Sequence, residues 1–541
     1  MHWFNAWDEP WVPIVDGGGT TDCSLSHVFA QAHEIRQLDR ANPLVEVAVF
    51  RLLLAIVVDA LGLTGDDRWR ERWRSGQFDP AEFERYAALV KDRFYLFDDV
   101  APFYQVADLC TPSGKVGSTL LLFPEMASGN NVPLYSSATE GTAPPVLPAE
   151  AARRLVALQA FDCAGLKSGA VNDPLMAAGK TTGNPIGPLG LIGAMIPQGR
   201  NLFDSLMLSL PPTPVVVGDT PAWRRPPAGA AWETRPSRGV LDLLTWQSRR
   251  LRLVPDDVTC PQTVVGVVVA AGDRLDALNP SHEPHAAWRA ADASRGGMSQ
   301  TPVRLQPGRA AWRGLDAMVA LNQDHVSERM QAIGKRQPVS PAWALQWIGT
   351  RNETIGLEYP LGVRTVGVAY GNQRAVIDHT MSDAIPLPVL ALTEEAEGIA
   401  VQAALIEIVA MAETIRIALN QLANNLLKSL GGTPIPWDKG EHLGDRFIQL
   451  VDTPARRLLE ECRDDPGGID GHLSDWQSAA WLAAWSIADP VLRQAPPAAF
   501  LGRQTDADKR LNQAQAERFF AATLTRTLPQ AARHFASERR Q

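Results

Sequence analysis

The sequence is poor in cysteine and histidine, with five cysteines and ten histidines in 541 residues. No CxxC pair occurs, and no two cysteines stand close together; they are Cys23, Cys110, Cys163, Cys260 and Cys462. A long chain with so few and such scattered cysteines is typical of a reduced protein without a disulfide framework or a zinc-binding cluster. We therefore expect a cytoplasmic protein that holds no metal.

A long uninterrupted apolar run is also missing. The opening segment, MHWFNAWDEPWVPIV, has no basic stretch followed by an apolar run, so it does not predict a signal peptide. The longest apolar helical segment, residues 399–427, is interrupted by Glu407, Glu413 and Arg416, which argues against a membrane span. With 45% apolar and 21% charged residues, the chain is expected to be globular, and its length favours more than one domain.

The sequence lacks an excess of basic residues. Its formal net charge is -9 and its pI is about 5.7. A protein that binds DNA on its own usually shows a basic balance, so this charge argues against that class. It leaves room for local basic clusters, and for a subunit whose partners supply most of the positive channel.

No enzyme motif is found: the chain contains no GxSxG, no HExxH and no recognisable Cys/His dyad. The segment DHTMSD, residues 378–383, offers Asp-His-Asp, but a metal phosphohydrolase needs more histidines at helical spacing. A polar strand end is the simpler interpretation. We predict no catalytic residue and no cofactor.

The segment PLMAAGKTTG resembles a phosphate-binding loop at Gly179-Lys180-Thr181. The full motif needs a glycine where Pro174 stands, and proline removes one backbone N–H from a site that works through N–H groups. An NTP-dependent nucleic-acid-processing enzyme that uses this loop is therefore the alternative function, and saturable ATP binding would support it. A flexible glycine loop that lets backbone approach another molecule closely is also open.

Residues 1 to about 385 have mixed, irregular patterning. A helix is predicted at Leu44–Leu63, a short strand at Phe94–Phe97, and a buried strand at Val264–Ala270, where VVGVVVA is largely β-branched. The stretch from Asn130 to Pro214 is rich in proline and glycine and predicts a long loop region, which is usually functional or disordered.

Two further segments of this part carry basic residues. In LTWQSRRLRLVP the arginines alternate with Leu251 and Leu253, which predicts a strand with one basic face, either solvated or in contact with phosphate or a partner; the arginines are Arg249, Arg250 and Arg252. Arg274 directly follows the β-branched strand, where an arginine is usually a surface charge.

The segment VGVAYGNQRAVID, residues 366–378, predicts a hairpin. Its apolar, β-branched flanks favour two strands, and its tip is Gly371-Asn372-Gln373-Arg374. Two amides and a guanidinium at one tip could read or open a nucleic-acid duplex. The alternative is a solvated turn without a function.

The pattern changes after Pro388. Thr393 is expected to cap a helix that carries Glu394 and Glu395 in its first turn and ends before Gly431-Gly432. Apolar residues recur at alternating spacings of four and three and form an a/d seam of Val401, Leu405, Ile408, Ala412, Ile415, Leu419, Leu422 and Leu426.

Three more helical segments follow, near residues 440–464, 474–490 and 507–537. Four helices with short connections predict an antiparallel four-helix bundle. The fold class is therefore α+β: a large, irregular mixed α/β domain at residues 1–388, followed by a four-helix bundle at residues 389–541.

Four segments in this order resemble one family, the large subunit (CasA type) of the type I-E CRISPR Cascade complex. They are FNAWDEPWVPIV near the N-terminus, FYLFDDVAPFYQV at residues 94–106, LTWQSRRLRL, and the hairpin YGNQRAVI. The predicted bundle also lies where that family has one, so the resemblance covers nearly the whole chain.

The resemblance implies a non-catalytic subunit of an RNA-guided surveillance complex. Such a subunit recognises the protospacer-adjacent motif in duplex DNA, promotes local unwinding and R-loop formation, and recruits a helicase-nuclease, while the guide RNA reads the long sequence by base pairing. The expected partners are the other Cascade subunits, CRISPR guide RNA, double-stranded target DNA and the helicase-nuclease, with no membrane. A free-standing helical scaffold is a third hypothesis, but it leaves the polar hairpin unexplained.

The resemblance also implies which residues meet DNA. The family's glycine loop matches Gly179, Lys180, Thr181, Thr182 and Gly183, and its basic finger falls at Arg274, with Arg289 or Arg295 as alternatives. The wedge hairpin matches Asn372, Gln373 and Arg374; the wedge is Arg374 by spacing and Gln373 by residue identity.

A loop that contacts the neighbouring subunit and the guide RNA is implied within residues 135–145. Its candidate residues are Tyr135, Ser136, Ser137, Thr139, Glu140 and Gly141. Ser, Thr, Gly and Pro dominate this segment, so we expect it to be disordered in the free chain. Some relatives carry a cysteine cluster that this chain lacks, which agrees with the expectation of no zinc.

Overall fold

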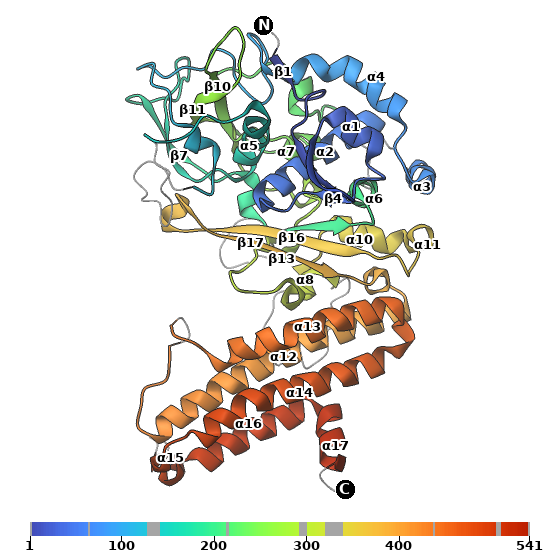
Figure 1. Cartoon of the computed structure of the whole chain (residues 1–541), viewed down its shortest axis with the longest axis vertical. Coiled ribbons are helices and arrows are strands. Elements are labelled where there is room, and N and C mark those ends of the chain that lie inside the picture. The colour runs from blue at the N-terminus through green and yellow to red at the C-terminus, as the bar shows by residue number, and fades with distance from the viewer. Residues whose placement is uncertain are drawn as a thin grey trace. The chain divides into compact units, whose positions relative to one another are not determined.

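The computed structural model describes residues 3–62, 65–126, 141–211, 216–290, 300–319, 339–436, 439–504 and 510–538. It is a mixed α and β structure with a C-terminal helical bundle, as the sequence predicts (Figure 1). The described residues form two compact units. The first, called the mixed unit below, draws on residues 1–309, 339–348 and 361–384, and the second, the helical unit, on residues 310–338, 349–360 and 385–541.

The mixed unit is built around helix α2, Pro43–Leu61, which confirms the predicted helix. Asn42 caps its start by accepting backbone N–H bonds from Leu44 and Val45, and Gly62 ends it in the left-handed conformation with φ 50°. Every residue from 44 to 58 is buried. A helix that is buried on all sides is a core helix, and α2 accordingly contacts α4 (Pro80–Val90), α6 (Leu202–Leu208) and other helices.

A four-stranded sheet forms the second part of this unit, in the order β10-β11-β6-β7. Its strands are β10 (Arg249–Pro255), β11 (Val264–Ala271), β6 (Gly165–Ser168) and β7 (Lys180–Asn184). The predicted buried strand is thus confirmed as β11, and the strand predicted at residues 94–97 is β5, Tyr95–Phe97. Helix α5, Pro148–Phe161, contacts β10 and leads into β6.

The prediction of a long loop region at residues 130–214 is wrong for its described part. That part contains α5, β6, β7, β8 (Ala194–Gln198) and α6. Several of these elements have only four to seven residues and stand between Gly and Pro. Segments this short show little periodicity, so the proline and glycine content dominated the sequence pattern.

The long hairpin lies in a three-stranded sheet of order β17-β16-β8 (Figure 1). Its strands are β16 (Gly362–Tyr370) and β17 (Ile377–Pro386), which confirms the predicted hairpin. β16 pairs antiparallel with β8, with Gly362 opposite Gln198 and Val366 opposite Ala194. The β16 side chains from Val363 to Val368 are buried, so the base of the hairpin is fixed in the core.

The remaining regular elements of the mixed unit are short helices and strands. They are β1 (Trp3–Asn5), β2 (Val12–Asp16), β3 (Gly19–Cys23), α1 (Leu25–Gln31), β4 (Gln37–Leu38), α3 (Asp66–Ser75), β9 (Thr234–Arg235), α7 (Val240–Leu244), β12 (Arg274–Leu275), β13 (Trp288–Ala290), β14 (Gln300–Pro302), β15 (Val339–Ser340) and α10 (Trp343–Thr350). Their strands pair as β1-β5, β3-β2-β4, β12-β9 and β14-β13-β15.

The helical unit is a bundle of four long helices: α12 (Ala396–Ser429), α13 (Leu443–Asp464), α14 (Ile469–Arg493) and α16 (Gln513–Thr527) (Figure 1). Helix α12 contacts each of the other three, and all eight residues of its predicted a/d seam are buried. Its most apolar window is long enough to cross a membrane, yet 72% of that window is buried inside the protein, as in a core helix. Four short helices also belong to the described part of this unit: α8 (Asp316–Val319), α11 (Asn352–Ile355), α15 (Pro497–Leu501) and α17 (Pro529–Glu538).

The predicted cap at Thr393 is wrong. Helix α12 begins at Ala396 with Glu395 as its N-cap residue, and the buried Thr393 hydroxyl donates to the Leu390 carbonyl instead. The preceding turn, Val389–Leu392, is also buried, so residues near 388 are not an exposed linker. The boundary between domains at residue 388 stays a proposal, because the helical unit also takes in the earlier segments 310–319 and 349–360.

One of these earlier segments is joined to the bundle through charge. Arg313 donates from Nε and Nη2 to Glu413 of α12, at 2.8 and 2.6 Å, and Arg416 donates to the other oxygen at 2.7 Å. Burial raises the pKa of the Glu413 carboxyl, but Arg313 and Arg416 outweigh it and hold the pKa below its usual value.

Replacing Arg313 with methionine should therefore lower the free energy of unfolding of the helical unit by about 1–3 kcal/mol, because it removes two bonds to a buried carboxylate. Since the folded pKa of Glu413 lies below the unfolded value of 4.5, the stabilising contribution is complete above that value and is lost as the pH falls through the folded pKa. Urea unfolding followed by helical circular dichroism, at neutral and at acid pH, measures both effects.

The matched control is Arg457→Met, which breaks an exposed pair with Glu461 on α13. An exposed i, i+4 pair is screened by water, so this variant should unfold like the intact protein. Equal losses in the two variants, or a loss in Arg313→Met that persists at acid pH, would contradict the assigned role of Glu413.

Candidate nucleic-acid interface

The tip of the β16–β17 hairpin is a strained and exposed turn. Asn372, Gln373 and Arg374 are all exposed. Gln373 has φ 54° and Arg374 has φ 63°, so two consecutive residues with side chains occupy the left-handed region. This conformation costs about 1–2 kcal/mol per residue, and such strain is concentrated at functional sites.

Hydrogen bonds close the turn on itself. Gly371 N–H donates to the Val376 carbonyl at 2.9 Å, and Arg374 N–H donates to the Gly371 carbonyl at 2.6 Å. A Cβ atom on Gly371 would collide with the carboxylate of the exposed Asp378, so any other residue here would force that side chain to move.

The tip is fastened to the connection between α5 and β6. Ala164 N–H donates to the Arg374 carbonyl at 2.9 Å, and the Tyr370 hydroxyl donates to the Phe161 carbonyl at 2.6 Å. These two bonds join residues more than 200 positions apart in the sequence. The exposed side chains of the tip therefore project from a base that is held in place.

Strands β6 and β7 form a second hairpin, whose long connection, residues 169–179, ends in a tight turn where the predicted glycine loop begins. Ala177 and Lys180 exchange both backbone hydrogen bonds, at 2.9 and 3.0 Å, across Ala178 (φ 50°) and Gly179 (φ 72°). Positive φ at both central residues defines a tight two-residue turn. Strand β7 then begins at Lys180, whereas a phosphate-binding loop requires a helix at this point.

The five candidate residues of this hairpin differ in exposure. Gly179, Lys180, Thr182 and Gly183 are exposed. Thr181 is buried, and its hydroxyl donates to the Asp173 carboxylate at 2.9 Å, so its side chain is occupied within the fold. The place of Thr181 in the predicted glycine loop stays a prediction, which its backbone could still fulfil.

Arg274 lies against this hairpin. Its Nη2 atom donates to the Thr182 carbonyl at 2.6 Å, and its guanidinium lies 4.0 Å from the centre of the Trp232 ring. Burial and the nearby Arg249 lower the pKa of Arg274, although an arginine keeps its charge at neutral pH. Of the two alternatives, Arg289 is exposed on β13, and Arg295 lies outside the described residues.

Sequence reasoning missed the residues that bring these segments together. The Asn184 amide donates to the Gly165 carbonyl at 3.0 Å and to the Thr181 carbonyl at 2.8 Å, and its oxygen lies 3.5 Å from Nη2 of Arg274. Because Ala164 holds the hairpin tip, residues 164 and 165 connect all three predicted segments. No local pattern marks Asn184 or Gly165 in the sequence.

A buried ion pair lies beneath this connection. Arg249 is 1% exposed, and its guanidinium donates to the Asp162 carboxylate, to the Cys163 carbonyl at 2.9 Å and to the Pro185 carbonyl at 2.6 Å. Lys167 also contacts Asp162, at 2.6 Å. Burial raises the pKa of Asp162, but Lys167 and Arg249 outweigh it and keep the pKa below its usual value.

The prediction of a basic strand face for solvent, phosphate or a partner is therefore wrong for Arg249 and Arg250. Arg250 is 6% exposed and donates to the Asp273 carboxylate and to the Ala231 carbonyl. The alternation of arginine with leucine identified the strand but not the burial of both faces. Arg252 is partly exposed.

Arg304 adds a second positive charge beside the hairpin tip. Its Nε donates to the Leu191 carbonyl at 3.1 Å. Burial lowers the pKa of Arg304, and repulsion from the positive charge of Arg374 lowers it further. Arg304 is 70 residues away from Arg374 in the sequence, so the sequence did not reveal this pairing.

The predicted partner loop falls mostly outside the described residues. Tyr135, Ser136, Ser137, Thr139 and Glu140 lie there, while Gly141 is described and exposed. Across the described ranges, no three His, Cys, Asp or Glu residues are grouped so that they could hold a metal ion.

A family model described as CRISPR-associated protein Cse1 matches residues 5–487. A relative from Thermus thermophilus, CRISPR-associated protein CasA/Cse1, is 30% identical over 500 residues, which is 90% of each chain.

Solved structures of the same family have this fold. Cse1 from Thermobifida fusca matches with a TM-score of 0.82 and 32% identity over 98% of both chains. Cse1 from Acidimicrobium ferrooxidans matches with 0.79 and 27% identity over 99% of both chains. A chain of a CRISPR RNA-guided surveillance complex, at 19% identity and a TM-score of 0.69 over 96% of this chain and 99% of that one, shares the fold.

Replacing Asp162 with asparagine should lower the free energy of unfolding by about 3–5 kcal/mol, because it leaves Arg249 and Lys167 buried without their counter-charge. Urea unfolding followed by tryptophan fluorescence measures the loss. The matched control is Asp108→Asn, an exposed position in the same unit, where no comparable loss is expected. A stability equal to that of the control would show that the ion pair does not hold this region together.

Proposed function

This chain belongs to the CRISPR-associated protein Cse1 family, the large subunit of the Cascade surveillance complex, and from that premise we propose how it acts on DNA. It recognises the protospacer-adjacent motif in duplex DNA, promotes local unwinding and R-loop formation, and recruits the helicase-nuclease. Its partners are the other Cascade subunits, the CRISPR guide RNA and the double-stranded target. It acts through binding and carries no catalytic site.

The observation that carries this proposal is the hairpin tip on its fixed base. Gln373 and Arg374 are exposed and strained, while the backbone beside them is bonded to Ala164 and the β16 side chains are buried. A mobile tip would be deflected by a base stack. A tip held at its base can transmit force to the stack instead.

Opening the duplex beside the motif requires only a modest free energy. Unstacking one base step costs on the order of a few kcal/mol, and contacts to the opened strands can offset it. Gln373 and Arg374 are the wedge candidates, because both lie at the tip and are exposed. The neighbouring Arg304 adds positive charge, which favours strands that carry phosphate.

The β6–β7 hairpin and Arg274 serve the recognition step. Lys180, Thr182 and Gly183 are exposed, and Arg274 is held beside them by the Thr182 carbonyl and by stacking on Trp232. An arginine held in a fixed position suits a narrow minor groove, where the negative potential is enhanced. Gly183, at φ 69°, lets the backbone come close to the groove without a side chain.

Binding of the neighbouring subunit and the guide RNA is assigned to the loop within residues 135–145. The acidic balance of the chain suits this arrangement, because the partners then supply most contacts to phosphate. An NTP-dependent enzyme is the weaker alternative. Pro174 replaces the first motif glycine, and a strand rather than a helix follows Lys180.

Replacing Asn372, Gln373 and Arg374 together with alanine should leave assembly with the other subunits unchanged and strongly reduce binding to a fully duplex target. Binding to a target that is already unpaired beside the motif should fall much less, because the cost of unstacking has been removed. Electrophoretic mobility shifts with the reconstituted complex and both targets measure the difference.

Two further variants refine that experiment. Arg374→Lys keeps the charge, and single alanine replacements of Gln373 and Arg374 identify which one is the wedge. Equal losses on both targets would mean that the tip only holds DNA. If binding to neither target is weakened, the tip is a solvated turn without a function.

Arg274→Gln should weaken binding to duplex and pre-opened targets by a similar factor, roughly tenfold or more, since one charged contact is worth about 1–3 kcal/mol in either case. The control is Arg252→Gln, a partly exposed arginine on β10 that loses the same charge. A loss confined to the closed duplex would instead place Arg274 in the opening step.

A further inference from the structure

The side chain of Arg274 is held more closely than that of an ordinary surface arginine. Its Nη2 atom donates to the Thr182 carbonyl at 2.6 Å and lies 3.5 Å from the Asn184 oxygen, and its guanidinium lies 4.0 Å from the centre of the Trp232 ring. Across the described ranges, its Nη1 atom forms no hydrogen bond and, unlike Nε, is not buried. One edge of a fixed guanidinium is therefore open to another molecule.

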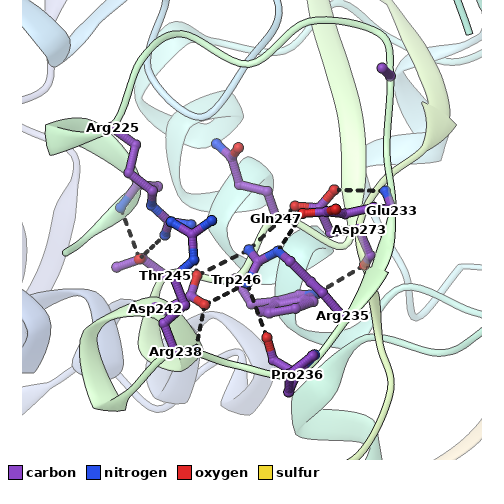
Figure 2. Close-up of polar contacts among 12 residues, drawn as sticks. Arg225, Glu233, Arg235, Pro236, Arg238, Asp242, Thr245, Trp246, Gln247 and Asp273 are labelled. Carbon is purple, nitrogen blue, oxygen red and sulfur yellow. Dashed lines mark hydrogen bonds and ion pairs between the residues drawn. The ribbon is translucent and has the colours of Figure 1, made fainter. Parts of the chain in front are cut away.

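Separate contacts fix the backbone of Arg274. Strand β12 begins at Arg274 and pairs in parallel with β9, and the Arg274 N–H donates to the Glu233 carbonyl at 2.9 Å. On β9, Arg235 donates to Asp242 at 2.6 and 3.1 Å and to Asp273 at 3.4 Å (Figure 2). Because Asp273 directly precedes Arg274, this network holds the start of β12 independently of the Arg274 side chain.

A single carboxylate supports both side-chain contacts of Arg274. Asp173 is 7% exposed, and its Oδ1 atom accepts from the Leu175 N–H at 2.9 Å. Its Oδ2 atom accepts from the Thr181 hydroxyl at 2.9 Å and from Nε1 of Trp232 at 3.2 Å. The bond from Thr181 holds β7 one residue before the carbonyl that receives Arg274. The bond from Trp232 fixes the ring on which the guanidinium lies.

The indole of Trp232 links this carboxylate to the guanidinium. Its N–H binds Asp173, and its ring face contacts Arg274. Indole is the aromatic side chain that attracts a cation most strongly through its face, so a ring that is held in place also holds the guanidinium in place. Burial and repulsion from Arg249 lower the pKa of Arg274, and attraction to Asp173 raises it.

We propose that Asp173 and Trp232 are positioning residues of the DNA-recognition step, which hold Arg274 with its Nη1 edge presented to the minor groove. This inference rests on the proposed function, in which Arg274 meets that groove. A flexible arginine would lose side-chain entropy on binding, and a side chain that is already fixed avoids this cost. Asp173 thereby favours the binding of DNA although its own charge is negative.

The alternative is that Asp173 only stabilises the β6–β7 hairpin. The two interpretations predict different results, and both differ from simple electrostatics. Removing a negative charge close to DNA ordinarily strengthens binding, because repulsion of the phosphates is reduced. A positioning role predicts that Asp173→Asn weakens binding, and that it does so only while Arg274 is present.

A double-mutant cycle of Asp173→Asn and Arg274→Gln tests this dependence, with mobility shifts of the reconstituted complex on a duplex target. Asp173→Asn alone should weaken binding roughly three- to tenfold, as expected for the loss of one or two hydrogen bonds. Added to Arg274→Gln, it should have no further effect, because the side chain that it positions is gone.

Two variants of Trp232 and one control complete the set. Trp232→Leu removes the ring face and should weaken binding more than Trp232→Phe, which keeps an aromatic face and loses only the N–H. The matched control, Asp276→Asn, removes the same charge from an exposed position two residues after Arg274 and should not weaken binding.

A second measurement needs no DNA. In the free chain labelled with 5-fluorotryptophan, the fluorine resonance of Trp232 is the one that is absent from Trp232→Phe. Arg274→Gln should shift this resonance, because it removes the cation from the ring face. The shift should be smaller in the Asp173→Asn background, where the guanidinium is no longer held against the ring.

Three results would overturn the inference. The first is duplex binding by Asp173→Asn as tight as that of the Asp276→Asn control. The second is an equal loss from Asp173→Asn with and without Arg274→Gln, which would assign Asp173 to the stability of the hairpin. The third is a fluorine shift of the same size in both backgrounds. If Arg274→Gln itself binds DNA normally, the proposed role of Arg274 fails instead, and the fluorine shifts alone decide whether Asp173 positions its side chain.

Discussion

The buried guanidinium of Arg249 is the interaction on which the arrangement of the interface depends. It joins the end of α5, through Asp162 and Cys163, to the residue after β7, through Pro185. Its backbone is held as well, since Gln159 both donates to its carbonyl and accepts from its N–H, each at about the length of a normal hydrogen bond. A charge this deeply buried is tolerated only with its full set of partners, so the surrounding segments are constrained together.

Because this centre is rigid, the strained conformation of the hairpin tip can be maintained. Two consecutive left-handed residues persist only where the surrounding structure determines them, and here the Ala164 and Tyr370 bonds do so. The exposed side chains can then meet DNA in a conformation that is already formed. The free energy that would otherwise order a flexible loop remains available for contacts with the opened strands.

Local patterns in the sequence predicted the elements that depend on local physics. The a/d seam of α12, the buried strand β11 and the β16–β17 hairpin were recognised from periodicity and turn chemistry. The prediction that Thr393 caps the helix was wrong, because its hydroxyl bonds to the nearby Leu390 carbonyl. The burial of Arg249 and Arg250 could not be predicted, because their partners lie far away in the sequence. Within the candidate interface, the hairpin tip could be predicted from such local patterns. Asn184, Arg304 and Trp232 could not, since only the fold brings them to their neighbours.

The central claim is that the tip opens the duplex before the guide RNA pairs with the target. The direct measurement is the fluorescence of 2-aminopurine placed beside the adjacent motif, in a duplex that has no complementarity to the guide. The account predicts that the fluorescence rises when the assembled complex binds this duplex, because the base leaves the stack without any help from pairing. Binding with unchanged fluorescence would contradict it and would assign the opening step to the guide RNA.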